Sequence, residues 1–268
     1  MFIDISTYVG HWPFRNLKNN TLDGLDELAQ RYDITHMVVA NLNGVFYKDV
    51  NYANLELLDW LSRYNGKTRF LPMAIINPAF PEWEKDARDM IAAGFAGFEL
   101  CPFYHGYSLA PEFLYDVYYP VHRAAEVLAL AEELDVPVRI CGNFEDPRGR
   151  SELDTSEAIK GEDLYKLLSQ NEKTHVFVTS YDLNAAGTNC AELIGSRKNT
   201  YFDTTRNFVF NKENGKRLMQ FLRTEQLCFG SHSPFFYMEA NLLKAAFEPA
   251  FDSERMKIAA ARAFRELR

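Results

Sequence analysis

The chain is short of basic residues and of long apolar runs. Its 268 residues include 29 Lys and Arg against 37 Asp and Glu, which gives a formal net charge of -8. Because nucleic acids and anionic membranes are bound mainly through clustered Lys and Arg, we expect neither as a partner. No apolar stretch approaches the ~20 residues that cross a bilayer, and the first residues lack a signal-peptide pattern. We therefore expect a cytoplasmic protein that binds a small molecule or another protein.

Cysteine is also scarce, and its spacing is uninformative for metal binding. The four residues Cys101, Cys141, Cys190 and Cys228 form no C-x-x-C pair, so neither a zinc ribbon nor a disulfide framework is indicated. Phosphate-binding loops are lacking as well, since neither a Walker pattern nor G-x-G-x-x-G occurs. We expect reduced thiols and no bound nucleotide.

Short β-branched or aromatic runs alternate along the chain with segments of helical period. Strands are expected at 2–8, 36–41, 70–77, 96–101, 136–141, 175–180, 200–203 and 227–230. Helices are expected at 22–32, 52–64, 81–93, 121–134, 162–170, 189–197, 215–223, 238–247 and 253–267. Eight such units predict an α/β fold, a single (β/α)8 barrel of TIM type that spans residues 1–268. The long connections 102–119, which is rich in aromatic residues and expected to fold as a lid, and 143–161 then belong to the carboxyl ends of the strands, where barrels build their sites.

Four segments carry a family resemblance. Residues 3–15 read I-D-I-S-T-Y-V-G-H-W-P-F-R, which resembles the first-strand pattern I-D-x-H-x-H-x-G, followed in some members by x-W-P-F, of the amidohydrolase superfamily. The segment G-S-H-S-P-F at 230–235 resembles that family's closing G-S-D-x-P-F, and the fifth and sixth strands are similar as well. The resemblance implies an amidohydrolase-type barrel and a hydrolase or a lyase, such as a decarboxylase or a lactonase.

The positions at which the family usually holds its metal ion are substituted in this chain. The residues found at those positions are Ser6, Tyr8, Cys141, Ser180 and His232. Because most of them are poor metal ligands, we expect no metal and no other cofactor. The alternative is a zinc ion bound by Cys141 and His232, with His105 or His11 as a third ligand.

Three of these residues are candidates for catalysis. His232 stands where the family has an aspartate that accepts protons, so we expect it to transfer protons, unless it is a structural histidine of its loop. Tyr8 is expected to donate a hydrogen bond to the substrate. Cys141 is a candidate nucleophile in a thiolate–imidazolium pair with His232, the alternative being a small buried apolar side chain.

Substrate binding is expected from further polar residues at the same end of the barrel. Arg139 either holds a substrate carboxylate through two hydrogen bonds or forms a buried ion pair with Glu99. The other candidates are Ser6, His11, His105, Asp146, Arg148, Ser180, Asp182 and Arg206. Together they predict a hydrolase or lyase that acts without a metal on a small oxygenated or carboxylate-bearing metabolite. The alternative is a catalytically silent relative that binds such a ligand or serves in an assembly, for example as a homo-oligomer.

Overall fold

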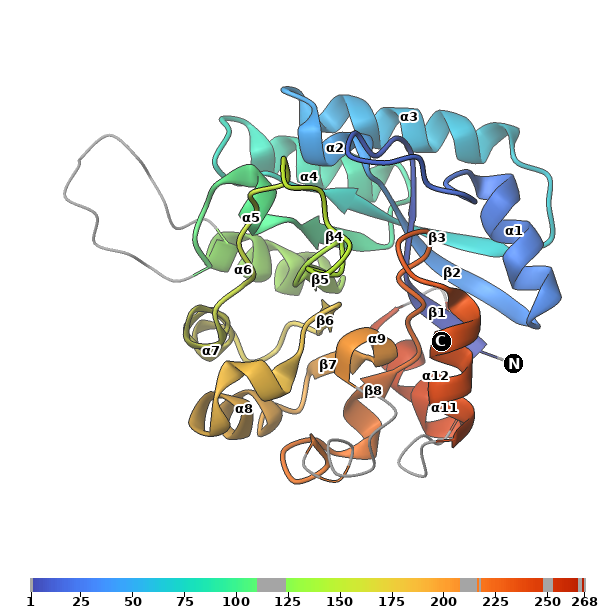
Figure 1. Cartoon of the computed structure of the whole chain (residues 1–268). Helices are drawn as coiled ribbons and strands as arrows, with labels where there is room; N and C mark the ends of the chain where they lie inside the picture. The colour runs from blue at the N-terminus through green and yellow to red at the C-terminus, as the bar shows by residue number, and fades with distance from the viewer. Residues whose placement is uncertain are drawn as a thin grey trace.

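The computed structural model describes residues 2–109, 124–207, 216, 218–247, 253–264 and 267. Eight parallel strands follow one another in chain order around a barrel, and helices cover its outer face (Figure 1). The strands are β1 (Phe2–Val9), β2 (Ile34–Asn41), β3 (Arg69–Ile75), β4 (Gly97–Leu100), β5 (Val138–Cys141), β6 (Val176–Thr179), β7 (Thr200–Asp203) and β8 (Leu227–Cys228). This arrangement confirms the predicted (β/α)8 barrel.

The helices include both the expected long ones and several short ones. Long helices are α1 (Leu22–Arg31), α3 (Val50–Arg63), α4 (Trp83–Ala92), α6 (Ala124–Leu134), α7 (Gly161–Gln170), α8 (Thr188–Gly195), α11 (Met238–Phe247) and α12 (Ser253–Ala263). Short ones, which the sequence did not predict, are α2 (Asn43–Phe46), α5 (Pro102–His105), α9 (Thr204–Asn207) and the 3-10 turns η1 (Leu183–Ala186) and η2 (Thr224–Gln226). Of the helix expected at 215–223, residues 216 and 218–223 are described; only 216 and 218 are helical, and residues 219–221 form a turn. The start of the helix expected at 121–134 lies outside the described residues.

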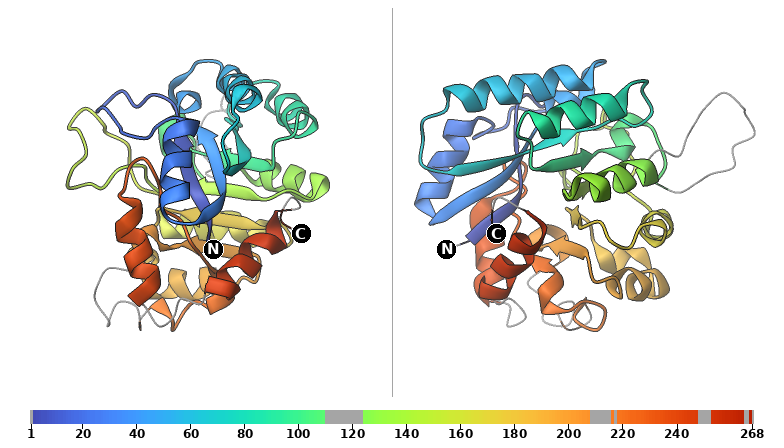
Figure 2. Two further views of the ribbon diagram at one scale, coloured as in Figure 1. Left: turned by 90° about the vertical axis from the view of Figure 1, so that its right-hand side faces the viewer. Right: turned by 180° about the vertical axis from the view of Figure 1, so that it is seen from behind.

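The barrel closes between its first and last strands. The amide of Ile5 donates to the carbonyl of Phe229 over 3.0 Å, and the amide of Tyr8 donates to that of Ser233 over 2.8 Å. Helix α12 packs against both β1 and β8 at this seam, as the two views of Figure 2 show. Phe264, just past its end, stacks on Phe177 of β6 with ring centroids 5.2 Å apart. The seam therefore depends on few backbone bonds and on the packing of a terminal helix.

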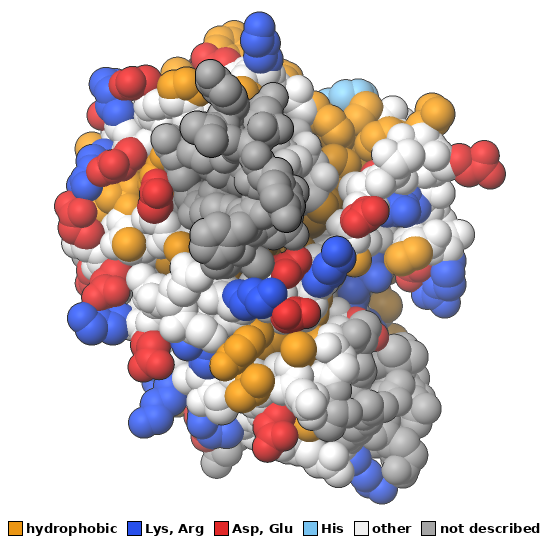
Figure 3. Space-filling view, turned by 90° about the vertical axis from the view of Figure 1, so that its left-hand side faces the viewer, with side chains coloured by type: hydrophobic (Ala, Val, Ile, Leu, Met, Phe, Trp, Pro, Cys, Tyr) orange, Lys and Arg blue, Asp and Glu red, His pale blue; other side chains and the backbone are white. Residues whose placement is uncertain are grey.

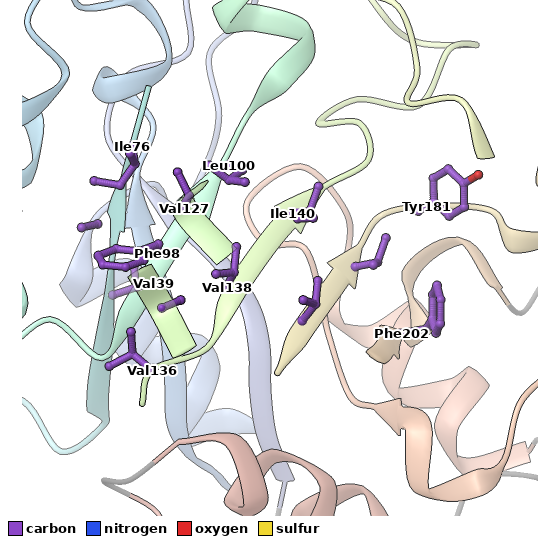
Figure 4. Packing of buried hydrophobic residues seen from close by; sticks show 14 of the residues in the cluster. Val39, Ile76, Phe98, Leu100, Val127, Val136, Val138, Ile140, Tyr181 and Phe202 are labelled. Atoms are coloured by element: carbon purple, nitrogen blue, oxygen red, sulfur yellow. The ribbon is translucent and has the colours of Figure 1, made fainter. Parts of the chain in front are cut away.

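Side chains alternate across each strand and so build two cores. Outward side chains such as Val39, Phe98 and Ile140 pack between the sheet and the helices (Figure 4). Inward side chains such as Val38 and Phe177 fill the barrel itself. Strands buried on both faces explain why these segments read as nearly continuous apolar runs in the sequence.

The surface is mixed in charge, and none of the described helices has the length and apolarity needed to span a membrane. On the face drawn in Figure 3, Lys and Arg side chains are interspersed with Asp and Glu. Neither sign of charge dominates that face.

Candidate active site at the barrel mouth

A buried ion pair occupies the centre of the barrel. Glu99 of β4 and Arg139 of β5 lie opposite each other in register, and Arg139 Nε donates to the Glu99 carboxylate. Arg139 Nη1 donates to the carbonyls of Ile5 and Val38 over 2.8 and 2.9 Å. The two charged side chains are 0% and 1% exposed. The structure therefore forms the ion pair that the sequence offered as the alternative to a carboxylate-binding arginine.

Tyr8 and Cys141 lie directly above this pair. The Tyr8 hydroxyl donates to Glu99 Oε1 over 3.1 Å, and its ring lies 4.8 Å from the guanidinium carbon of Arg139. Burial raises the pKa of both Tyr8 and Cys141 well above their ordinary values, and the Cys141 thiol also contacts the Tyr8 hydroxyl. Because the thiol stays protonated, this environment does not favour the thiolate that a Cys141 nucleophile would require.

His232 is held by both ring nitrogens. Its Nδ1 lies 3.0 Å from Ser6 Oγ and its Nε2 lies 3.1 Å from the carbonyl oxygen of Phe144. Since a carbonyl only accepts, Nε2 carries the hydrogen and Nδ1 accepts from the Ser6 hydroxyl. Burial, together with the nearby charges of Arg206 and Arg139, lowers the pKa of His232 well below its usual value. The imidazole is therefore neutral, and its backbone is held at a left-handed φ of 55°, a strained conformation of the kind found at functional sites.

Phe144 and Glu145, which follow β5, cover these groups and are called the plug from here on. The Phe144 ring contacts those of Tyr8, Trp12 and Phe235 with centroids 5.1, 5.3 and 5.3 Å apart. Phe144 itself and Tyr8 beneath it have no exposed surface. The plug therefore separates the polar centre of the barrel from solvent.

Three side chains from other parts of the barrel hold the plug. Arg15 Nε forms an ion pair with the Glu145 carboxylate, and Arg206 Nη2 donates to the Glu145 carbonyl over 2.5 Å. His232 supplies the third contact, to the carbonyl of Phe144. The second carboxylate oxygen of Glu145 is buried and has no hydrogen-bond partner among the described residues. Two cations and one imidazole thus converge on a segment of two residues.

Two buried carboxyl groups connect the strand ends around the plug. Asp203, at the end of β7, accepts from the amide of Ser180 over 3.0 Å and from the hydroxyl of Thr205 over 2.7 Å. Asp4 of β1 accepts from the amides of Ser6 and Ser231 over 3.1 and 3.0 Å. Burial raises the pKa of Asp4 to about 7 and that of Asp203 to about 6. Protonated or not, these groups tie β6 to β7 and β1 to the segment after β8.

A cavity of about 550 Å³ lies beside the plug, between α5 and residues 153–163. Its apolar wall includes Phe14, Phe46 and Tyr104, and the Tyr104 ring lies 5.6 Å from that of Phe144. The Tyr104 hydroxyl donates to Asp154 over 2.6 Å. Only the first part of the expected aromatic lid is described, because Phe113, Tyr115, Tyr118 and Tyr119 lie outside the described residues.

Several predicted site residues lie away from the plug. His105 on α5 contacts the carbonyl of Gly44 over 3.1 Å, and burial lowers its pKa to about 4. His11 is exposed at the edge of a separate cavity next to α1. Asp146 and Arg148 pair with each other over 2.7 Å, with the Arg148 side chain 90% exposed. His105, His11 and Arg148 have no described contact with the centre of the barrel, whereas the negative charge of Asp146 acts on the guanidinium of Arg206.

Other predicted residues do gather at the mouth. Ser180 accepts from Arg206 Nε over 2.9 Å, and the negative charge of Asp182 acts on the same guanidinium. The group that the structure brings together comprises Ser6, Tyr8, Glu99, Arg139, Cys141, Ser180, Asp182, Arg206 and His232. Sequence reasoning did not select the plug or Arg15. The only signal for Arg15 was its place directly after the W-P-F of the first-strand motif.

Comparisons with known proteins support the fold. No protein-family model matches the chain, and a comparison with curated proteins finds no match. The 2,6-dihydroxybenzoate decarboxylase from Rhizobium has a TM-score of 0.67 at 13% identity over 99% of each chain. Amidohydrolase 2 from Bifidobacterium longum subsp. infantis has a TM-score of 0.62 at 12% identity, also over 99% of each chain. The chain therefore has the fold of the amidohydrolase superfamily, as the sequence motifs predicted.

Structures of this fold also correct the expectation about cofactors. Dihydroxybenzoic acid decarboxylase from Polaromonas sp. JS666 contains bound manganese and the inhibitor 2-nitroresorcinol, with a TM-score of 0.68 at 14% identity over 100% of this chain and 98% of that one. The 5-carboxyvanillate decarboxylase of Novosphingobium aromaticivorans also has bound manganese, with a TM-score of 0.56 at 13% identity over 95% and 93%. The prediction that no cofactor belongs to this barrel is contradicted by these neighbours.

The donor residues of this chain do not fit such an ion at the mouth. In the parts of the chain that the structure describes, no three His, Cys, Asp or Glu side chains converge as metal ligands. The third ligand of the zinc alternative is missing as well, because His105 is bonded to Gly44 and His11 lies at another cavity. The guanidinium of Arg139 also places a positive charge beneath Tyr8 and Cys141. The disagreement with the manganese-containing neighbours therefore lies in the donor side chains and not in the barrel.

Proposed function

We propose that this protein is a lyase or hydrolase that binds a small carboxylate-bearing compound at the barrel mouth. The observation that carries the proposal is the convergence of Arg15, Arg206 and His232 on the oxygen atoms of the plug. Two guanidinium groups beside one imidazole are a donor set suited to a carboxylate, because charge-assisted hydrogen bonds are stronger than neutral ones. The named substrates of the decarboxylase neighbours are dihydroxybenzoates and a carboxyvanillate, which are carboxylates of this kind.

His232 is the proposed proton donor. A bound carboxylate brings negative charge close to the imidazole, which favours the protonated ring and so opposes the effect of burial. The Ser6 hydroxyl, 3.0 Å from Nδ1, then accepts the hydrogen that this nitrogen gains. In a decarboxylation the bond between carbon and the carboxylate breaks, carbon dioxide leaves, and the electron pair stays on carbon. That carbon takes the proton from His232 Nε2, and solvent reprotonates the imidazole.

Ligand binding without turnover is the second candidate. It is favoured by the mutual bonding of Tyr8, Glu99 and Arg139, which have no exposed surface and whose polar atoms contact one another and backbone carbonyls, except that Arg139 Nη2 has no partner among the described residues. Buried polar groups that satisfy one another stabilise a barrel whether or not it catalyses a reaction.

A ligand panel followed by turnover assays tests both candidates. We expect hydroxybenzoates or phenylacetates to raise the melting temperature, and their neutral amides to raise it less. Arg15→Ala should weaken carboxylate binding about tenfold or more, because it removes one charge-assisted contact. Equal binding of the amides, or no loss in Arg15→Ala, would count against a carboxylate site.

The turnover assay then examines His232. His232→Ala removes one of the three binding groups, so carboxylate binding should weaken; at saturating substrate, turnover should also fall about 10² to 10⁴-fold, the usual contribution of a general acid. His232→Asp should shift the pH optimum downward, because a carboxyl group titrates near ~4 instead of ~6.5. Binding without turnover of any bound compound in the wild-type protein would favour the second candidate.

A further inference from the structure

The three groups proposed to bind a carboxylate are already occupied by the chain itself. Arg15 contacts the carboxylate of Glu145, Arg206 contacts its carbonyl, and His232 contacts the carbonyl of the preceding residue. The aromatic side chains that would surround a ligand ring, Tyr8, Trp12 and Phe235, instead surround Phe144. A ring and a carboxylate, supplied by neighbouring residues, thus fill the mouth together.

We propose that the plug is an intramolecular occupant of the ligand site, and that a compound carrying an aromatic ring and a carboxylate binds by displacing Phe144 and Glu145. This inference rests on the proposed function. It adds that the binding groups are preformed and blocked, and that the affinity measured for a ligand is lowered by the free energy needed to remove the plug.

The contacts of Glu145 show why the plug can be exchanged. Its side chain is 2% exposed, yet one carboxylate oxygen is buried without a partner in the described part of the chain, which is an unfavourable arrangement for a charged group. Its partner Arg15 is 44% exposed, so that guanidinium is reached from solvent. An external carboxylate that satisfies both of its own oxygens would bind Arg15 without this penalty.

The surroundings of Phe144 also allow it to leave. The plug belongs to the long connection between β5 and α7, so its movement breaks no strand pairing. The cavity of about 550 Å³ begins at Tyr104, whose ring contacts Phe144. Phe144 does not line this cavity, so it would reach the space by displacing Tyr104 of α5, a movement that leaves the strands of the barrel in place.

A ligand-free experiment tests the plug directly. Cys141 has no exposed surface and lies in the same buried cluster as Phe144, whereas Cys190 is partly exposed. Glu145→Gln removes the charge held by Arg15 while keeping the side-chain size, and it should raise the rate of Cys141 labelling by a maleimide about tenfold. Cys190 in the same molecule serves as the internal reference, and mass spectrometry identifies the labelled thiol. An unchanged Cys141 rate would overturn the proposal.

Two further variants guard against ambiguous results. Phe144→Leu keeps an apolar side chain in place of the ring and should also expose Cys141, with folding checked by circular dichroism. Glu152→Gln is the matched control, because it makes the same chemical change at an exposed glutamate of the same connection. Faster labelling in the control as well would indicate general loosening of the connection and would contradict a specific plug.

Ligand titrations separate this inference from the proposed function. With benzoate, 4-hydroxyphenylacetate and their amides as probes, Glu145→Gln should lower the Kd of the carboxylates about tenfold and leave the amides unchanged. Carboxylate binding that is equal in wild type and Glu145→Gln would keep the proposed function and overturn the plug. A third outcome is faster Cys141 labelling in Glu145→Gln but no carboxylate binding to any variant. The plug would then be mobile, but the carboxylate ligand and the proposed function would both be refuted.

Discussion

Two carboxylate–guanidinium pairs lie one above the other in this barrel and differ in what surrounds them. The lower pair, Glu99 and Arg139, is formed by neighbouring strands, and neither side chain is more than 1% exposed. The upper pair, Glu145 and Arg15, is formed by two connections, and its arginine is 44% exposed. The same two chemical groups therefore stand once inside the barrel and once at its entrance.

The difference indicates which pair can exchange its partner. Arg139 also donates to the carbonyls of Ile5 and Val38, so its release would leave several buried polar groups unsatisfied. Among the described residues, Arg15 has one further hydrogen bond, to the carbonyl of Phe235 over 3.2 Å. We infer that the lower pair belongs to the stability of the barrel and the upper pair to its function.

Breaking the lower pair should have the largest effect on stability. Glu99→Ala leaves the guanidinium of Arg139 buried without its counter-charge, so the free energy of unfolding should fall by roughly 3 to 5 kcal/mol. Urea unfolding followed by circular dichroism measures this change. The double variant Glu99→Gln with Arg139→Met, which removes both charges, should recover most of the loss. A change below about 1 kcal/mol in Glu99→Ala would refute the assignment of this pair to stability.

Asp4 extends the comparison of the two ion pairs to a buried carboxyl group that no guanidinium contacts among the described residues. Its contribution to the stability of the folded state should depend on pH. The pKa of Asp4 is raised to about 7 in the folded protein, against ~3.9 for an unfolded aspartate. The folded state therefore binds more protons between these values, and the contribution of Asp4 to stability is lost as pH rises from about 4 through 7. The slope should be about 1 kcal/mol per pH unit. His232, whose pKa is lowered, acts in the opposite direction below about pH 6.5.

Asp4→Asn isolates this effect, because the amide carries no titrating proton. The difference in urea midpoint between this variant and the wild type should vary with pH between 5 and 8, since only the wild type loses the contribution of Asp4. A constant difference across that range would show that Asp4 ionises as an ordinary surface carboxyl does.

An exposed pair in the same connection as the plug should have the smallest effect. Asp146 and Arg148 pair over 2.7 Å with the arginine side chain 90% exposed, and Arg148 lowers the pKa of Asp146 to about 2. Because exposed pairs contribute little, Arg148→Gln should change the free energy of unfolding by less than about 0.5 kcal/mol. We also expect the Kd for a carboxylate probe to stay within about twofold. A loss of carboxylate binding as large as that in Arg15→Ala would show that Arg148 belongs to the binding site. It would then contradict the distinction between the exposed pair and the pair of Arg15 with Glu145.

The direction of the candidate side chains was predictable where strand periodicity decided it. Tyr8, Arg139 and Cys141 were expected to point into the barrel because side chains alternate along a strand, and the structure places all three in its centre. His105 and His11 were predicted from loops, where no periodicity fixes direction. The structure turns the first toward Gly44 and leaves the second exposed beside another cavity.

By itself the sequence determined the barrel, because eight apolar strands alternating with amphipathic helices leave few other ways to bury both faces of a sheet. Through its resemblance to the amidohydrolase motifs, it also predicted that imidazoles are missing from the usual ligand positions. Only the tertiary structure decided that Phe144 and Glu145 fill the mouth. The side chains that hold them follow β1, β7 and β8 and lie more than 50 residues away in the sequence. Such contacts join positions distant in sequence, and no local pattern of residue types encodes them.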